Sequence, residues 1–173
     1  MRDHPARDSR PARTSLRRSW AGHGRLITVE KDPLGRYLDD VVRMFADVSI
    51  PVLPSLLFVL VSADLRFFGV KSGAFFWWMS VTAAATFVRG GWVDPPFTDV
   101  PGWVAVTPVL VALRIVAFNG ALLLAAYGSG AVASAVGVPV LAPVLAVCVG
   151  VGTALGFPRL AEVVYEAADR GPA

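Results

Sequence analysis

The chain has little of what most enzymes and metalloproteins use for chemistry. It has one cysteine, Cys148, and two histidines, His4 and His23, both near the amino terminus. A single cysteine cannot form an internal disulfide, and no haem or metal site of the usual histidine type is available. The sequence also lacks a glycine-rich phosphate loop, a nucleophile elbow and carboxylates paired at a defined spacing. It therefore predicts no enzyme, no cofactor and no metal site.

Charge is also scarce, and it is unevenly distributed. Charged residues make up 17% of the chain and the apolar set AVILMFWYC makes up 55%, whereas an average soluble domain has about 25% charged residues. Of the 16 Lys and Arg, ten lie in residues 1–43, and of the 13 Asp and Glu, seven lie in residues 1–47. This division predicts a polar amino-terminal region followed by a membrane-embedded remainder.

Residues 1–25 form a basic tail with almost no large apolar side chains. We expect this tail to be disordered and cytoplasmic. The net charge of +3 raises the question of nucleic acid, but no binding module surrounds the basic residues, so we expect no nucleic-acid partner. A tail that sets membrane topology and touches anionic lipid accounts for the same charges.

Residues 32–48, within a region spanning 26–48, have the clearest amphipathic pattern. Asp32 suits an N-cap and Pro33 suits a first turn. Apolar residues recur at the spacing of one helix face: Leu34, Tyr37, Leu38, Val41, Val42, Phe45 and Val48. Two interpretations stay open, a helix that lies in the membrane interface or a helix that docks a partner.

Four apolar segments follow within residues 49–158, at about 50–70, 72–92, 103–127 and 138–157. Each is close to the roughly 20 residues needed to cross hydrocarbon. The stretch GSGAVASAVG before the fourth segment could be a loop or extend either helix. Residues 159–173 suggest a short helix that breaks away at Pro158. The sequence thus predicts an all-α membrane protein with four transmembrane helices preceded by an interfacial amphipathic helix.

Lysines and arginines near the spans indicate the orientation. The amino-terminal side carries Lys31, Arg36, Arg43 and the basic tail, whereas the opposite side carries only Arg66 and Lys71. By the positive-inside rule we expect a multi-pass protein of the cell membrane with both termini in the cytoplasm.

The stretch VLVSADLRFF, residues 59–68, places two charges in or near the first span. The uncharged run from Ile50 to Ala63 covers about 21 Å as a helix, which is short of the roughly 30 Å hydrocarbon core. The segment is therefore either re-entrant or a span that continues to Val70. In a helix Asp64 and Arg66 point in nearly opposite directions; Arg66 can snorkel outward, but Asp64 needs a partner, a proton or water.

Arg114, in the third apolar segment, is the predicted partner of Asp64. An arginine at mid-bilayer costs about 2.5–3.5 kcal/mol on insertion scales. If the first and third spans run in the same direction, the two residues lie at similar depths. The pair is either an interhelical clamp or a proton or anion site with Asn119 as a neighbour.

Gly152 and Gly156 form a small-xxx-small pattern that predicts helix packing, either within the chain or in a homodimer. Trp77 and Trp78 are expected to face lipid. We expect the lipid bilayer, copies of the chain or other membrane subunits as partners. The leading hypothesis is a non-enzymatic scaffold or subunit of a membrane complex; the alternative is a small transporter or channel component with a polar site around Asp64 and Arg114.

Overall fold

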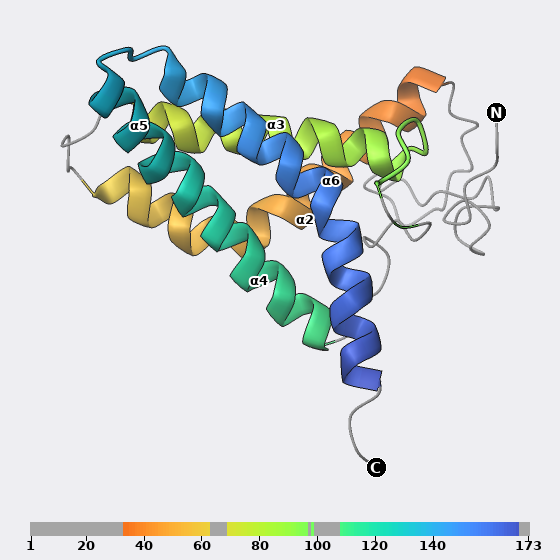
Figure 1. Ribbon diagram of the computed structural model, residues 1–173. Coiled ribbons are helices and arrows are strands. Elements are labelled where there is room, and N and C mark those ends of the chain that lie inside the picture. Colours follow the sequence, from red (N-terminus) through yellow and green to blue (C-terminus); the bar gives the residue numbers. More distant parts are fainter. Residues whose placement is uncertain (1–32, 63–68, 97, 99–107, 170–173) are drawn as a thin grey trace, which may run out of the picture.

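The computed structural model describes residues 33–62, 69–96, 98 and 108–169, and all the regular elements in these ranges are helical (Figure 1). They are α2 (Pro33–Val61), α3 (Val70–Arg89), α4 (Pro108–Leu123), the π-helical turn η2 (Leu124–Gly128), α5 (Ser129–Val136) and α6 (Leu141–Asp169). The all-α class is confirmed for the described residues.

The amphipathic segment and the first apolar segment form one continuous helix, α2, rather than two elements. Pro51 and Pro54 lie inside it without ending it. Prolines remove backbone donors, but membrane helices tolerate them when neighbouring groups use the freed carbonyls. The prolines free the carbonyls of Asp47 and Ile50, four residues earlier. The Asn119 side-chain amide donates to a different carbonyl, that of Pro51, at 2.7 Å and so joins α4 to this part of α2.

The third apolar segment continues further than the sequence suggested. Its described part begins at Pro108, the first residue of α4. The stretch GSGAVASAVG extends the helix through η2 and α5 rather than forming a loop. Gly137 then ends the helix with a φ of 73°, a left-handed conformation that favours glycine, and Val138 N–H donates to the Ala133 carbonyl at 3.0 Å.

Helix α6 continues through Pro158 to Asp169, so the predicted separate helix after Pro158 is wrong. Figure 1 shows α6 bending in its second half, where this proline lies. A proline inside a helix costs one hydrogen bond and commonly produces a bend instead of a break.

Three stretches are long and apolar enough to cross a membrane: Tyr37–Val61, Pro108–Val136 and Leu141–Val164. Within the described residues α3, with 20 residues, is not among them. Serines, threonines and two tryptophans lower its hydropathy. The structure therefore supports membrane association, and it does not establish a count of four spans.

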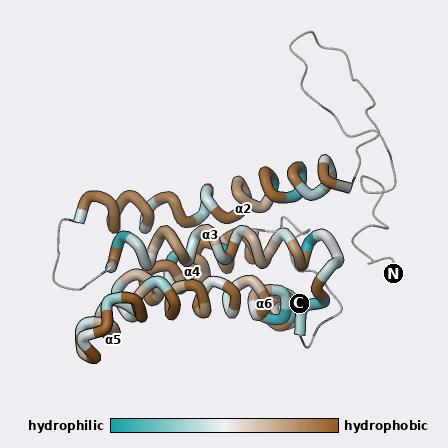
Figure 2. Tube along the Cα trace, turned by 90° about the horizontal axis from the view of Figure 1, so that it is seen from above, coloured by the Kyte–Doolittle hydropathy of each residue, from teal (hydrophilic) through white to brown (hydrophobic). Residues whose placement is uncertain are grey.

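Helix α3 nevertheless occupies the centre of the bundle. It packs most extensively against α6 and next against α2, while α4 contacts both α2 and α6. Figure 2 shows α3 between α2 and α6. Trp77, Val81 and Ala85 of α3 are completely buried. The expectation that Trp77 faces lipid is therefore wrong, because its helix is covered on both sides.

Candidate functional site

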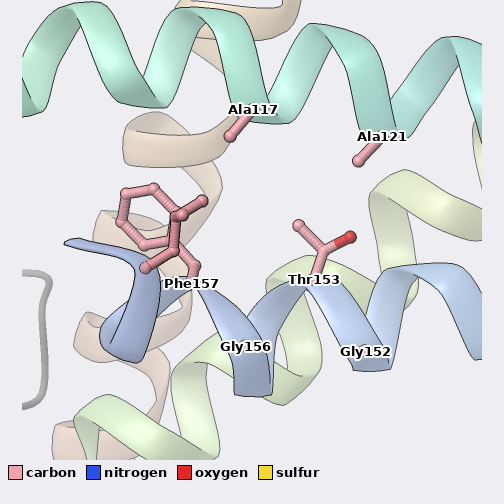
Figure 3. Close-up of a pocket in the computed structure, with 7 residues that line it drawn as sticks. Ala117, Ala121, Gly152, Thr153, Gly156 and Phe157 are labelled. Atoms are coloured by element: carbon pink, nitrogen blue, oxygen red, sulfur yellow. The ribbon is translucent and has the colours of Figure 1, made fainter. Parts of the chain in front are cut away.

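An open groove of about 330 Å³ lies between α4 and α6 (Figure 3). Ala117 and Ala121 project into it from α4, and Thr153 and Phe157 project from α6. The remaining lining residues are Gly152, Gly156 and Leu160. The Thr153 hydroxyl already donates to the Val149 carbonyl at 2.7 Å. The groove therefore offers an apolar surface of mostly small residues.

The two glycines singled out by the sequence keep this groove open. A Cβ atom built on Gly152 or Gly156 would meet no other atom within 4 Å. Neither glycine therefore packs a helix closely within the chain, and their role in packing against a second copy stays a prediction.

The closely packed glycines lie elsewhere. A Cβ atom on Gly150 would lie 2.8 Å from the Trp77 carbonyl oxygen, and one on Gly73 would lie 3.0 Å from the Ala125 carbonyl oxygen. These contacts bring α3 against α6 and η2. Gly150, together with Ala146, extends the small-xxx-small pattern of the two groove glycines, whereas Gly73 stands outside it. The pattern alone does not distinguish the packed glycine from the two open ones.

Arg114 lies at one end of the groove. It shares a face of α4 with Ala117 and Ala121, at spacings of three and then four residues. Its guanidinium carbon lies 6.0 Å from the centroid of the Phe157 ring, which lines the groove. Arg114 is only 8% exposed, and its Nε and Nη2 atoms have no hydrogen-bond partner among the described residues. A buried cation with two free donors is costly unless an anion reaches it.

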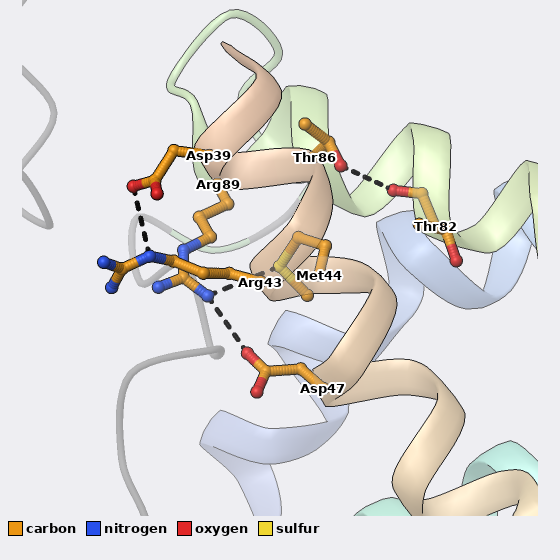
Figure 4. A network of polar contacts seen from close by, with 7 residues as sticks. All are labelled: Asp39, Arg43, Met44, Asp47, Thr82, Thr86 and Arg89. Atoms are coloured by element: carbon orange, nitrogen blue, oxygen red, sulfur yellow. Dashed lines mark hydrogen bonds and ion pairs between the residues drawn. The ribbon is translucent and has the colours of Figure 1, made fainter. Parts of the chain in front are cut away.

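The charged neighbours of Arg114 come from α2 and α3. Arg89, the last residue of α3, donates from Nη1 to Oδ2 of Asp47 at 3.0 Å and contacts the Met44 sulfur at 3.6 Å (Figure 4). Asp47 and Arg89 are the charged groups whose fields act on Arg114. Asp47 is paired with Arg89 and acts on Arg114 only through space, so among these three described groups the positive charges outnumber the negative ones by one.

Asp47, Arg89, Arg114 and the Arg159–Glu162 pair on α6 lie at the same end of the helices, which we name the charged end. Phe118 of α4 contacts Phe157 of α6, with ring centroids 4.9 Å apart, and Arg159 pairs with Glu162 at 2.7 Å in the adjoining turn. Arg114 is six residues after the start of α4 and 22 before Val136, a length of about 33 Å. Within the described residues Arg114 therefore lies in the second turn of α4, and its depth in the bilayer stays a prediction.

The predicted contact between Asp64 and Arg114 involves a residue outside the described ranges, and it stays a prediction, as does the snorkelling of Arg66. The described contacts do confirm that α2 and α4 run in the same direction. Asn119 is bonded to Pro51, and the Ser62 and Tyr127 hydroxyls lie 2.9 Å apart. Tyr127 is 13 residues beyond Arg114, about 20 Å along the helix. Asp47 is the carboxylate that the structure places near Arg114, and sequence analysis missed it.

The hydrogen-bond partners of Asn119 differ from the polar site with Arg114 that the sequence predicted. Its Nδ2 donates to the Pro51 carbonyl at 2.7 Å and to the Ile115 carbonyl at 2.6 Å. Its buried Oδ1 has no partner in the described part of the chain. Asn119 thus joins α4 to α2, and its described hydrogen bonds are not with Arg114.

We expect Asp47→Asn to destabilise the charged end more than Asp39→Asn does. Asp47 compensates Arg89 directly and Arg114 through space, whereas Asp39 pairs with Arg43 one turn away on the same helix, where such pairs contribute only a few tenths of a kcal/mol. Because the Asp47 and Arg89 side chains are 39% and 27% exposed, solvent screening limits the loss to about 1 kcal/mol. Thermal unfolding in detergent measures the difference. Equal midpoints for the two variants would show that Asp47 does not compensate Arg114.

The fold and this site define a class: a helical membrane protein with a basic cluster at one end of its bundle. The chain belongs to the family described as a domain of unknown function, DUF8215, whose profile matches residues 31–164. The match begins just before α2 and includes all but the last residues of α6. No curated protein and no solved structure matches the sequence.

Proposed function

We propose that the chain is a non-enzymatic subunit of a membrane assembly, with four spans and both termini in the cytoplasm. The observation that carries the proposal is the apolar filling of the bundle. Trp77, Phe118 and Leu122 are completely buried in its core. In the described part of the chain most charged side chains lie at the charged end, with Lys71 at the opposite end of α3, and they do not form a path between the ends. Such an interior suits a protein that acts through its outer surfaces.

The charged end supports the count of four spans. Measured from this end, α3 has 20 residues, α4 to α5 has 22 after Arg114, and α6 has 18 before Arg159. These stretches are about 27–33 Å long, close to the hydrocarbon thickness of roughly 30 Å. Helix α3 can cross despite its lower hydropathy because α2 and α6 cover it.

The first half of α2 supplies the surface for a partner. Leu34, Leu38, Val42 and Phe45 form an exposed apolar stripe, and Val42 is 67% exposed. The Tyr37 ring stacks on Trp92 with centroids 5.2 Å apart, which fixes this half of the helix to the chain after α3. An anchored helix with one apolar face suits helix-to-helix docking beside the membrane.

Cysteine labelling tests the topology directly. In a Cys148→Ser background, we expect Val138→Cys to react with an impermeant maleimide in intact cells, and Asp94→Cys to react only after permeabilisation. If α3 does not span and the amino terminus is cytoplasmic, the two results are exchanged. The experiment therefore distinguishes four spans from three.

A double substitution tests the role as a subunit. We expect Leu38→Glu with Val42→Glu to reduce the mass of the native complex in mild detergent to that of the single chain, with unchanged helical content. Val163→Glu on α6 is the matched control, because Val163 is also exposed and apolar. An unchanged complex in the double variant would exclude the stripe as the docking surface.

One observation favours the alternative, a small transporter or channel component. The unpartnered Nε and Nη2 atoms of Arg114 could bind an anion in transit. Purified protein in vesicles should then conduct chloride or phosphate above the level of protein-free vesicles, and Arg114→Gln should remove the flux. Such a result would replace the subunit proposal.

A further inference from the structure

We propose that the groove between α4 and α6 binds one acyl chain of an anionic phospholipid, whose phosphate pairs with Arg114. The inference rests on the membrane location proposed above and is independent of partner docking on α2. Three features support it: the charge of Arg114, which has unpaired donors among the described residues, the apolar lining of the groove, and the position of the charge at one end of the groove.

The unsatisfied charge requires an anion. Arg114 is more than nine-tenths buried, and two of its three guanidinium nitrogens have no partner among the described residues. The Asp47 Oδ2 atom is already bonded to Arg89 at 3.0 Å, so the cluster keeps its excess of positive charge. A phosphate can accept two parallel hydrogen bonds from a guanidinium group, which a chloride ion cannot.

The groove requires an apolar occupant. Of its seven lining residues only Thr153 carries a polar side-chain group, and that hydroxyl donates to its own helix and accepts from Trp77. No polar side chain of the lining is therefore left to bind a polar ligand. The glycines at 152 and 156 leave open space where other residues would place a side chain.

The charge of Arg114 and the apolar groove follow one another along the helices, as the headgroup and the acyl chain of a lipid do. From Arg114 at the charged end, the groove continues past Ala117 to Ala121, near the middle of the continuous helix formed by α4, η2 and α5, and from Leu160 to Gly152 toward the middle of α6. A lipid phosphate would then lie at the level of Arg89 and Arg159, and its chain would enter the hydrocarbon core. Basic sites between membrane helices on the cytoplasmic side commonly bind anionic headgroups in this way.

A helix from a second copy is the competing occupant, since small residues also favour helix crossing. We favour the lipid because a helix surface fills the groove without supplying the anion that Arg114 needs. Substitutions in the groove should reduce lipid binding if a lipid occupies it, and should reduce dimer formation if a second copy does.

Lipid selectivity of the purified full-length chain tests the proposal. Phosphatidylglycerol and phosphatidylcholine with identical chains are titrated into the detergent-solubilised protein, and bound lipid is counted by native mass spectrometry. We expect the wild type to prefer phosphatidylglycerol by roughly fivefold to tenfold, the effect of one or two well-placed cationic contacts. Glycerol phosphate, which lacks acyl chains, should bind weakly and should not displace the lipid.

Two kinds of variant separate the headgroup contact from the chain contact. Arg114→Gln should abolish the preference between the two lipids while a chain still enters the groove. A Cβ atom at position 156 meets nothing within 4 Å, so the side chain of Gly156→Leu can occupy the groove and should remove tight binding of both lipids. Gly120→Leu is the matched control, because Gly120 is on α4, also meets nothing within 4 Å and does not line the groove. It should bind lipid as the wild type does.

A photoreactive phosphatidylglycerol with a diazirine in its acyl chain gives a second measurement, which does not depend on any substitution. We expect cross-links on peptides from α4 and α6 around Ala121 and Gly152. Equal affinity of the wild type for both lipids, or cross-links confined to other helices, would overturn the proposal. Loss of a dimer mass in Gly156→Leu with unchanged lipid binding would assign the groove to a second copy instead. Topology labelling is unaffected by either result.

Discussion

Gly150→Leu is expected to prevent stable packing of α3 against α6. A side chain at this position would collide with the backbone of α3, since a Cβ atom alone would lie 2.8 Å from the Trp77 carbonyl oxygen. Overpacking of a core costs about 1–3 kcal/mol when flexible side chains can move aside. Here the obstacle includes a main-chain atom of the central helix, so we expect a loss at the upper end of this range or beyond. Even Gly150→Ala should be clearly destabilised.

Gly152→Leu is the control for this prediction, because it adds the same side chain two residues along the same helix. A Cβ atom there meets nothing within 4 Å, so the variant should fold as the wild type does. Thermal unfolding followed by circular dichroism in one detergent compares the two. If Gly150→Leu and Gly152→Leu unfold at the same temperature, the close contact between α3 and α6 is not present in solution.

Trp77→Ala should also lower the free energy of unfolding strongly, because it removes side-chain volume from the core, whereas Gly150→Leu adds it. Trp77 is the largest fully buried side chain in the described core, and its indole nitrogen donates to the Thr153 hydroxyl over 3.5 Å. Truncation of a buried tryptophan to alanine typically costs about 3–5 kcal/mol, mostly through the cavity it leaves. The long hydrogen bond contributes little beside this term.

Phe76→Ala is the matched control, since the neighbouring Phe76 is an exposed aromatic residue of the same helix. It should lose much less stability, because in a membrane its ring only exchanges protein contacts for lipid contacts. The free energy of unfolding of both variants can be measured in mixed micelles. A similar loss for the two would place Trp77 at the lipid-facing surface after all.

The apolar segments could be located from the sequence because length and composition suffice for that purpose. The break expected between the amphipathic segment and the first span was wrong for a local reason. Pro51 and Pro54 each remove one backbone hydrogen bond without ending α2, and a change of polarity alone did not end the helix either. The mid-span position expected for Arg114 depends on residues before Pro108, which lie outside the described ranges, and stays a prediction.

The candidate site was harder to predict because its contacts join distant parts of the chain. Asp47 and Arg89 are 42 residues apart, and no helical periodicity reveals a pair at that separation. Arg114 itself was identified, since a lone charge in an apolar run is conspicuous. Its contact with Phe157, like the burial of Trp77, depends on which faces of uniformly apolar helices meet, and composition does not encode that choice clearly.

The central position of α3 has a consequence for biogenesis. The helix that shields it most, α6, is synthesised last, and its contacts with α3 join residues more than 70 positions apart, such as Trp77 and Thr153. Until α4 and η2 are synthesised, α3 therefore has only α2 to cover its serines, threonines and buried indole. These polar groups should make its release into lipid as a single helix unfavourable, so α2 and α3 should enter the bilayer together as a hairpin. A truncated chain that ends before α6 would then expose a surface suited to recognition by membrane quality-control proteases.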